Sequence, residues 1–190
     1  MSCVTIGRRR GGTIGRVATY PIRLFGDPVL KRPAAPVADF DGALAKLVDA
    51  MYETMYKAPG VGLAAPQVGV QRRFFVYDVG EGPHALANPE IVETEGEWEY
   101  EEGCLSLPGL AFDIVRPKVV TVMGLDLEGN PVTVVGDELL GRLLLHEVDH
   151  LDGVLMLERL AADDRKLALR TLREQAMNGG PAPNSRRHAL

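Results

Sequence analysis

Apolar residues recur every three or four positions in three segments of the chain, and this spacing predicts three helices. The first helix begins after Asp39 or Asp41, either of which can cap its N-terminus, and ends at Pro59. We expect Asp137 to cap the second helix, which ends at Gly153, and the third helix to cover 163–177. The apolar positions are Leu44, Leu47, Val48, Met51 and Met55 in the first helix, and Leu139, Leu140, Leu143, Leu144, Leu145, Val148 and Leu151 in the second.

Shorter runs rich in β-branched and aromatic residues predict strands between the first two helices. They cover 73–79, 85–93, 97–101, 118–126 and 131–135, and the turn residues at 127–130 join the last two as a hairpin. A Gly- and Ala-rich stretch at 60–67 lies between the first helix and these strands, and a tight loop is one interpretation of it. A helix, then several strands, then helices are typical of an α+β domain rather than of an alternating α/β fold.

The length of 190 residues fits one domain, since domains usually hold about 100–200 residues. We expect a disordered extension at 1–20, where Gly and Arg are frequent, a single folded domain at 21–178 and a disordered tail at 179–190. The formal net charge of −5 argues against nonspecific binding to DNA. No apolar run approaches the ~18 residues that can span a bilayer, so no membrane partner is expected.

The pentapeptide His146-Glu147-Val148-Asp149-His150 lies in the second predicted helix. Residues four apart share one face of a helix, so both histidines can bind a single metal ion. Glu147 then lies beside the ion and can carry a proton without being a ligand. The same string also occurs in ordinary helices with two surface histidines. A helix as apolar as this one, however, is expected to be largely buried. Burying its histidines and carboxylates without partners is unfavourable, and a metal ion would supply the partner for the histidines.

Cys104, in the segment Glu102-Gly103-Cys104-Leu105-Ser106, is the candidate third ligand. Two imidazoles and a thiolate leave one coordination position open, as in catalytic rather than structural metal sites. Gly103 would let a strand bend so that the sulfur reaches the helix. Taken alone, Cys104 would be interpreted as a small buried apolar residue; the histidine pair favours the ligand interpretation.

The stretch 60–67 carries a third candidate feature. Its glycines permit the close approach of another chain, and its alanines permit tight packing under a site. Gln67 is a neutral donor that could stabilise an oxyanion without changing the charge of the site. A tight loop without any catalytic part is the alternative for this stretch.

Together these three segments resemble the signature segments of the peptide deformylase family. They occur in the family's order and at roughly its spacing, and the opening 24–30 (LFGDPVL) is similar to the start of a deformylase. The resemblance covers about 21–163, most of the chain. The chain departs from the family pattern in its longer N-terminal extension and in Ala111, where several members carry an arginine.

The resemblance implies a compact α+β domain in which antiparallel sheets pack around a central metal-binding helix, with a C-terminal helix. It implies a hydrolase that removes the formyl group from N-formylmethionine of nascent polypeptides in the bacterial cytoplasm. The ribosome, near its exit tunnel, is a candidate partner. Family members commonly use one Fe2+ ion, and Zn2+ or Ni2+ can take its place.

A mechanism follows from these groups. A water on the metal, whose pKa the ion lowers, would attack the formyl carbon, and formate would be released. Glu147 would take the proton of the water and deliver it to the departing amine. The roles implied by the resemblance are Cys104, His146 and His150 as metal ligands, Glu147 as general acid/base, and Gln67 with the Leu105 N–H as oxyanion donors.

The substrate site is a further prediction. Leu139 and Leu143 lie seven and three residues before His146, on the metal-facing side of the helix. They could line a pocket for an unbranched methionine side chain, with plain core packing as the alternative. The backbone of 60–63 could pair with an extended peptide. The predicted substrate-binding residues are Val61, Gly62, Gly103, Tyr100, Leu139 and Leu143.

Ligating histidines usually donate their second ring N–H to an acceptor. Glu102 and Asp149 are the candidate acceptors, and Arg116 is a possible counter-charge. Surface salt bridges are the alternative for all three residues.

Two other functions fit parts of the sequence. A metalloendopeptidase with the same pair of histidines would take its third ligand downstream of the helix. A non-catalytic module would use the metal structurally, or would bind rRNA through basic residues of the last helix, for which a solvated face is the alternative. The downstream acidic candidates are Asp152, Glu158, Asp163 and Asp164, and the basic residues are Arg165, Lys166, Arg170 and Arg173.

Overall fold

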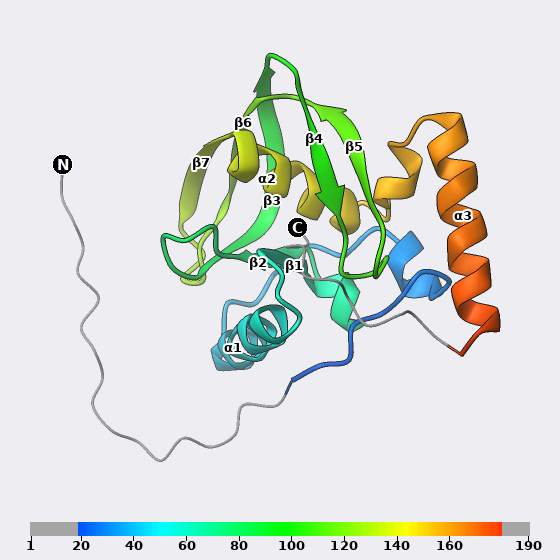
Figure 1. Ribbon diagram of the computed structural model, residues 1–190. Coiled ribbons are helices and arrows are strands. Elements are labelled where there is room, and N and C mark those ends of the chain that lie inside the picture. The colour runs from blue at the N-terminus through cyan, green and yellow to red at the C-terminus, as the bar shows by residue number, and fades with distance from the viewer. Residues whose placement is uncertain (1–18, 180–190) are drawn as a thin grey trace.

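Three α-helices form where the apolar spacing predicts them, as Figure 1 shows for residues 19–179, the part of the chain that this computed structural model describes. Asp41 caps the first helix, because its carboxylate accepts hydrogen bonds from the N–H groups of Ala43 and Leu44. Asp137 is the N-cap residue of the second helix, as predicted, but its side chain accepts no capping hydrogen bond. The helices are α1 (Gly42–Lys57), α2 (Glu138–Leu151) and α3 (Ala162–Met177).

Within residues 19–179 the strands form two antiparallel sheets. The larger sheet has the order β1-β2-β3-β6-β7, and β4 pairs with β5 in the smaller one. The hairpin predicted around 127–130 is confirmed, since β6 pairs with β7. The strands are β1 (Gly62–Ala64), β2 (Phe74–Tyr77), β3 (His84–Glu95), β4 (Trp98–Gly103), β5 (Ala111–Arg116), β6 (Val119–Leu125) and β7 (Pro131–Asp137).

Two of these strands were not predicted. β1 has only three residues, all buried, and is too short to show any alternation; a 3₁₀ turn, η2 (Ala65–Val68), follows it. The interpretation of 60–67 as a simple loop is therefore wrong. In β5 the buried positions are Ile114 and Arg116, while Val115 is more than half exposed. Strands are recognised in a sequence by apolar residues that alternate with polar ones. In β5 an arginine points inward and a valine points outward, so this alternation is not visible.

The two faces of β2 explain how the helices are placed. Phe74 and Val76 pack in one core cluster with Met51 of α1. Phe75 and Tyr77 pack in another with apolar residues of α2. Because neighbouring side chains of a strand point to opposite faces, α1 and α2 cover opposite sides of the larger sheet at this point.

The β4–β5 hairpin completes the enclosure of α2, which lies between the two sheets (Figure 1). Ala168 of α3 packs in a third core cluster with Cys104 and Ile114. The predicted α+β fold, with antiparallel sheets around a central helix and a C-terminal helix, is confirmed. The disorder expected at 1–20 and 179–190 concerns residues that, apart from 19, 20 and 179, lie outside the described part of the chain. No helix within the described range is both long and apolar enough to cross a membrane.

Candidate metal centre

Cys104, His146 and His150 converge on one point. Their candidate ligand atoms all lie within 4.8 Å of one another, and all three side chains are buried. Cys104 Sγ lies 3.2 Å from His150 Nε2. Bonds of ~2.0–2.3 Å to a tetrahedral ion would place the ligand atoms roughly 3.4–3.7 Å apart, so this set fits a single ion. Within residues 19–179 it is the only such group of three potential ligands.

The fold brings these ligands together from two elements. His146 and His150 lie on one face of α2, one helical turn apart. Cys104 directly follows Gly103, the last residue of β4, which pairs with Ala111 of β5. The hairpin therefore holds the sulfur against the helix that carries both imidazoles.

The donor atoms around this point suit a metal ion. Nε2 of His146 is buried without a hydrogen-bond partner among the described residues, while Nδ1 lies 2.7 Å from Glu102 Oε1. Burial by itself would lower the pKa of His146, but Cys104 and Glu102 raise it well above its usual value. Burial, together with His146, holds the pKa of His150 well below its usual value. A sulfur and two imidazoles, with one ring nitrogen of His146 left without a partner among the described residues, form a donor set that suits a transition-metal ion.

Glu147 lies beside the ligands but is not one of them. Its side chain is fully buried, and neither carboxylate oxygen has a hydrogen-bond partner within residues 19–179. Burial raises its pKa to about 7. The carboxylate lies so close to Gly62 that a Cβ atom at position 62 would be 2.3 Å from Oε1. Glycine at this position therefore lets β1 pass directly against the carboxylate.

Gln67 is oriented toward the same point. Its Oε1 accepts a hydrogen bond of 2.8 Å from the Ala64 N–H, so its amide nitrogen faces the other way. Nε2 donates to Ser106 Oγ at 3.2 Å and lies 3.9 Å from Cys104 Sγ. Ser106 was not singled out in the sequence, although it lies in the motif of Cys104. The Leu105 N–H belongs to the residue that follows the cysteine, and its place in the site remains a prediction.

The predicted substrate-binding residues are only partly brought together. Val61 and Leu143 pack in the core cluster of α2. Leu139 is 39% exposed, and Tyr100 is 50% exposed with its ring stacked on Trp98 at 4.6 Å. Gly62 and Gly103 border the metal centre as described above. Their assignment to a pocket remains a prediction.

Glu102 is the hydrogen-bond partner of His146, a candidate ligand, and Arg116 is its counter-charge. Both oxygens of Glu102 accept hydrogen bonds of 2.7 Å from Arg116. Burial would raise the pKa of Glu102, but His146 and Arg116 hold it well below its usual value. Asp149 binds Arg116 and Arg159 instead of a histidine.

One residue of this network was missed in the sequence. Arg142 is fully buried and donates a hydrogen bond of 2.9 Å to Glu102 Oε2. It stands four residues before His146 within an otherwise apolar stretch of α2. The sequence did contain a signal for Arg142, because it is a charged residue on the same helix face as His146, a candidate ligand.

The acidic residues that could give a metalloendopeptidase its third ligand do not lie at the metal centre. Asp152 pairs with Arg73 at 2.6 Å, and Glu158 pairs with Lys31. Asp163 is almost fully exposed and pairs with Lys166, and Asp164 is also exposed. None of them belongs to the group of candidate ligands, so the peptidase hypothesis has no support in the described residues.

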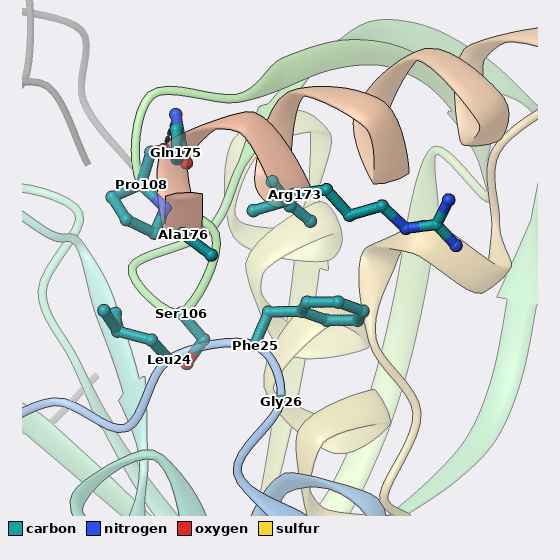
Figure 2. Close-up of a pocket in the computed structure, with 9 residues that line it drawn as sticks. Leu24, Phe25, Gly26, Ser106, Pro108, Arg173, Gln175 and Ala176 are labelled. Carbon is teal, nitrogen blue, oxygen red and sulfur yellow. Dashed lines mark hydrogen bonds between the residues drawn. The ribbon is translucent and has the colours of Figure 1, made fainter. Parts of the chain in front are cut away.

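A separate pocket opens away from the metal centre, between the segment 24–26 and the C-terminal end of α3 (Figure 2). Its volume is about 350 Å³, and Leu24 and Phe25 face Arg173 and Ala176 across it. Ser106 is its one lining residue that also contacts the metal centre, through Gln67. Because no candidate metal ligand lines it, this pocket is not the predicted substrate site.

A family model, known sequences and solved structures are similar to this chain over most of its length. A family model described as Polypeptide deformylase matches residues 19–166. A peptide deformylase of Acidothermus cellulolyticus is 51% identical over 163 residues, 86% of this chain and 91% of that protein. One of Parafrankia is 50% identical over 165 residues, 85% of this chain and 90% of that protein. The crystal structure of a peptide deformylase from Legionella pneumophila matches with a TM-score of 0.81 and 41% identity, covering 87% of this chain and 100% of that one.

Proposed function

Because this chain belongs to the peptide deformylase family, whose function is to remove the N-terminal formyl group from nascent peptides, we propose that Cys104, His146 and His150 hold one metal ion for this hydrolysis. The observation that carries the proposal is the convergence of a thiol and two imidazoles within 4.8 Å. Three protein ligands leave a coordination position for the reactants, which distinguishes a catalytic from a structural site.

Glu147 is proposed as the general acid/base. When bound, the ion would supply a Lewis acid and lower the pKa of a water molecule. Glu147 has no competing hydrogen-bond partner among the described residues, which leaves its carboxylate free to accept a proton from the attacking water. It then delivers this proton to the amine of methionine as the bond to the formyl carbon breaks, and formate is released.

Gln67 and the Leu105 N–H are proposed as donors to the oxyanion that develops on the formyl group. The hydrogen bond from Ala64 to Oε1 supports this role, because it directs the amide nitrogen of Gln67 toward the site before the substrate arrives. Such preorganised donors stabilise the transition state without reorienting during the reaction.

Replacing Gln67 with leucine should lower kcat by about 10²–10³-fold with little change in metal content, because leucine has a similar volume but no donor. Formate release and elemental analysis measure the two quantities. Gln71→Leu is the matched control: this amide lies near the same turn but donates to the Val29 carbonyl, so its kcat should stay near that of the wild type. Equal rates for Gln67→Leu and the wild type would remove Gln67 from the reaction.

For the substrate, we propose that an extended peptide pairs with β1, an edge strand of the larger sheet. Edge strands have backbone groups free to pair with another chain, and this mode accepts many sequences after the first residue. Gly62 and Gly103 would permit close approach of the peptide. The methionine side chain would contact Val61, Tyr100, Leu139 and Leu143.

Exchange of Leu139 for tryptophan should raise KM for formyl-methionyl peptides by about tenfold or more, since an indole would narrow a pocket that fits an unbranched chain. Metal content should stay unchanged. Steady-state kinetics of formate release provide KM and kcat separately. Leu167→Trp, at an exposed position of α3, is the control for the added indole. A KM like that of the wild type would place Leu139 outside the pocket.

The proposed resident ion is Fe2+, which Zn2+ or Ni2+ could replace, since imidazole and thiolate ligands suit all three. Anaerobic purification, elemental analysis and formate release from a formyl-methionyl tripeptide test the function and the ion together. About one iron per chain and peroxide-sensitive formate release would support the proposal, since a thiolate and ferrous iron are both oxidisable. A metal-loaded protein that releases no formate would contradict the function.

We also propose that the reaction takes place in the bacterial cytoplasm at the ribosome, where formylated chains emerge. The support is a row of exposed basic side chains on α3, which could contact rRNA. Sedimentation of the protein with ribosomes at low and high salt would test this contact. The basic residues are Arg165, Lys166, Arg170 and Arg173.

A further inference from the structure

Arg142 is a buried arginine that joins three elements of the fold. It lies in α2 and is inaccessible to solvent. Nη1 donates a hydrogen bond of 2.9 Å to Glu102 Oε2. Nη2 donates to two backbone carbonyls, that of Trp98 in β4 at 2.8 Å and that of Ile114 in β5 at 2.9 Å. One guanidinium thus holds both strands of the small sheet against α2.

These contacts also determine how Glu102 faces the metal centre. Oε2 of Glu102 accepts from Arg142 and from Arg116 Nε, while Oε1 accepts from Arg116 Nη2 and lies 2.7 Å from His146 Nδ1. Since Oε2 is engaged by both arginines, Oε1 is directed toward the imidazole. The position of Arg142 therefore bears on the ring orientation of a candidate ligand.

The place of Arg142 in the sequence links the two sources of ligands. It stands one turn before His146 on the same face of α2. The strand that it binds at Trp98 is β4, which leads directly to Cys104. The aromatic rings of Trp98 and Tyr100 lie over the guanidinium, with centroids 5.1 and 6.0 Å from Cζ, and cover it.

Stability alone does not account for a charge at this position. Buried ion pairs can often be replaced with apolar residues of similar size at little or no loss of stability. Nε of Arg142 is also buried without a partner among the described residues, so the site is not optimised for holding this side chain. Two of its three contacts, to Glu102 and to the Trp98 carbonyl, are made to the strand that leads to Cys104.

We propose that Arg142 is a positioning residue of the metal centre. Its guanidinium sets the separation between the sulfur on the hairpin and the imidazoles on α2, and orients His146 through Glu102. This inference rests on the proposed metal site of Cys104, His146 and His150. It does not place Arg142 in contact with the substrate or the ion.

The test compares Arg142→Met and Arg142→Lys with the wild type, each loaded with Co2+, whose absorption bands report the geometry of its ligands. Affinity is measured by competition with a chelator. We expect both variants to bind Co2+ about 10–100-fold more weakly than the wild type, with shifted bands. Methionine removes the charge, and lysine keeps the charge but cannot reach three acceptors with a planar fork.

Arg159→Met is the matched control, because Arg159 belongs to the same ion-pair network but binds only Asp149. Its cobalt spectrum and affinity should stay like those of the wild type. Circular dichroism and thermal unfolding of the metal-free proteins separate ligand geometry from a general loss of structure. If Arg142→Met does not fold, the lysine variant still decides the question.

Two failures are distinguishable. If the wild type binds no Co2+, the metal site itself is wrong. If the wild type binds one ion and a folded Arg142 variant has the same affinity and spectrum, only the positioning role is overturned. An equal change in Arg159→Met would also overturn it, since the effect would then come from the loss of any ion pair in the network.

Discussion

We expect the Glu147→Gln variant to hold its metal ion normally and to release formate about 10²–10⁴-fold more slowly than the wild type. The reason is chemical, because glutamine keeps the size of the side chain but cannot take up a proton. Gly62 also confines the site on one side, because it lies so close to the carboxylate that no residue larger than glycine fits at position 62.

The measurement combines kcat for a formyl-methionyl peptide with the metal content of the same preparation. Glu138→Gln is the matched control, since this exposed glutamate of α2 pairs with Lys118 at the far end of the helix and should be replaceable without loss of rate. Loss of metal from Glu147→Gln would mean that the residue acts through the ligands. A near-normal rate with intact metal would exclude Glu147 as the acid/base.

Local sequence patterns were sufficient to predict the helix of the two histidines. The spacing of His146 and His150 follows directly from helical geometry, and the apolar residues around them predict that the helix is buried. Cys104 could be proposed as the third ligand only because its chemistry matches that of the pair. No pattern in the sequence measures the distance between positions 104 and 146, which the packing of the small sheet against α2 determines.

Two of the features that the sequence did not predict depend on tertiary contacts. The strand β5 was missed because Arg116 points inward, where it meets Glu102 and Asp149. Asp137 occupies the N-cap position of α2 without a side-chain hydrogen bond; it is also the last residue of β7, and the next N–H, that of Glu138, bonds to the Lys118 carbonyl. In each case a polar group finds its partner on a distant segment, and local propensity contains no information about that segment.

Replacing Cys104 with alanine should abolish tight metal binding and, with it, formate release. Two imidazoles alone provide two of the three ligands, and the thiolate is the only one that adds negative charge to the site. The cost in folding should be small, of the order of 1 kcal/mol, because alanine fits the core cluster of Leu107 and Ile114 that surrounds the sulfur. The measurements are elemental analysis and unfolding with and without added metal.

The unfolding experiment distinguishes the deformylase from a peptidase-like centre. A ligand that binds only the folded state raises the unfolding temperature, so added Zn2+ should stabilise the wild type and not Cys104→Ala. Cys3→Ala, the same change at the other cysteine of the chain, should respond like the wild type. If Cys104→Ala instead keeps one ion with wild-type affinity, the third ligand must come from another residue. In that case the sulfur has no part in binding, and the proposed site would have to be rebuilt around His146, His150 and a ligand other than Cys104.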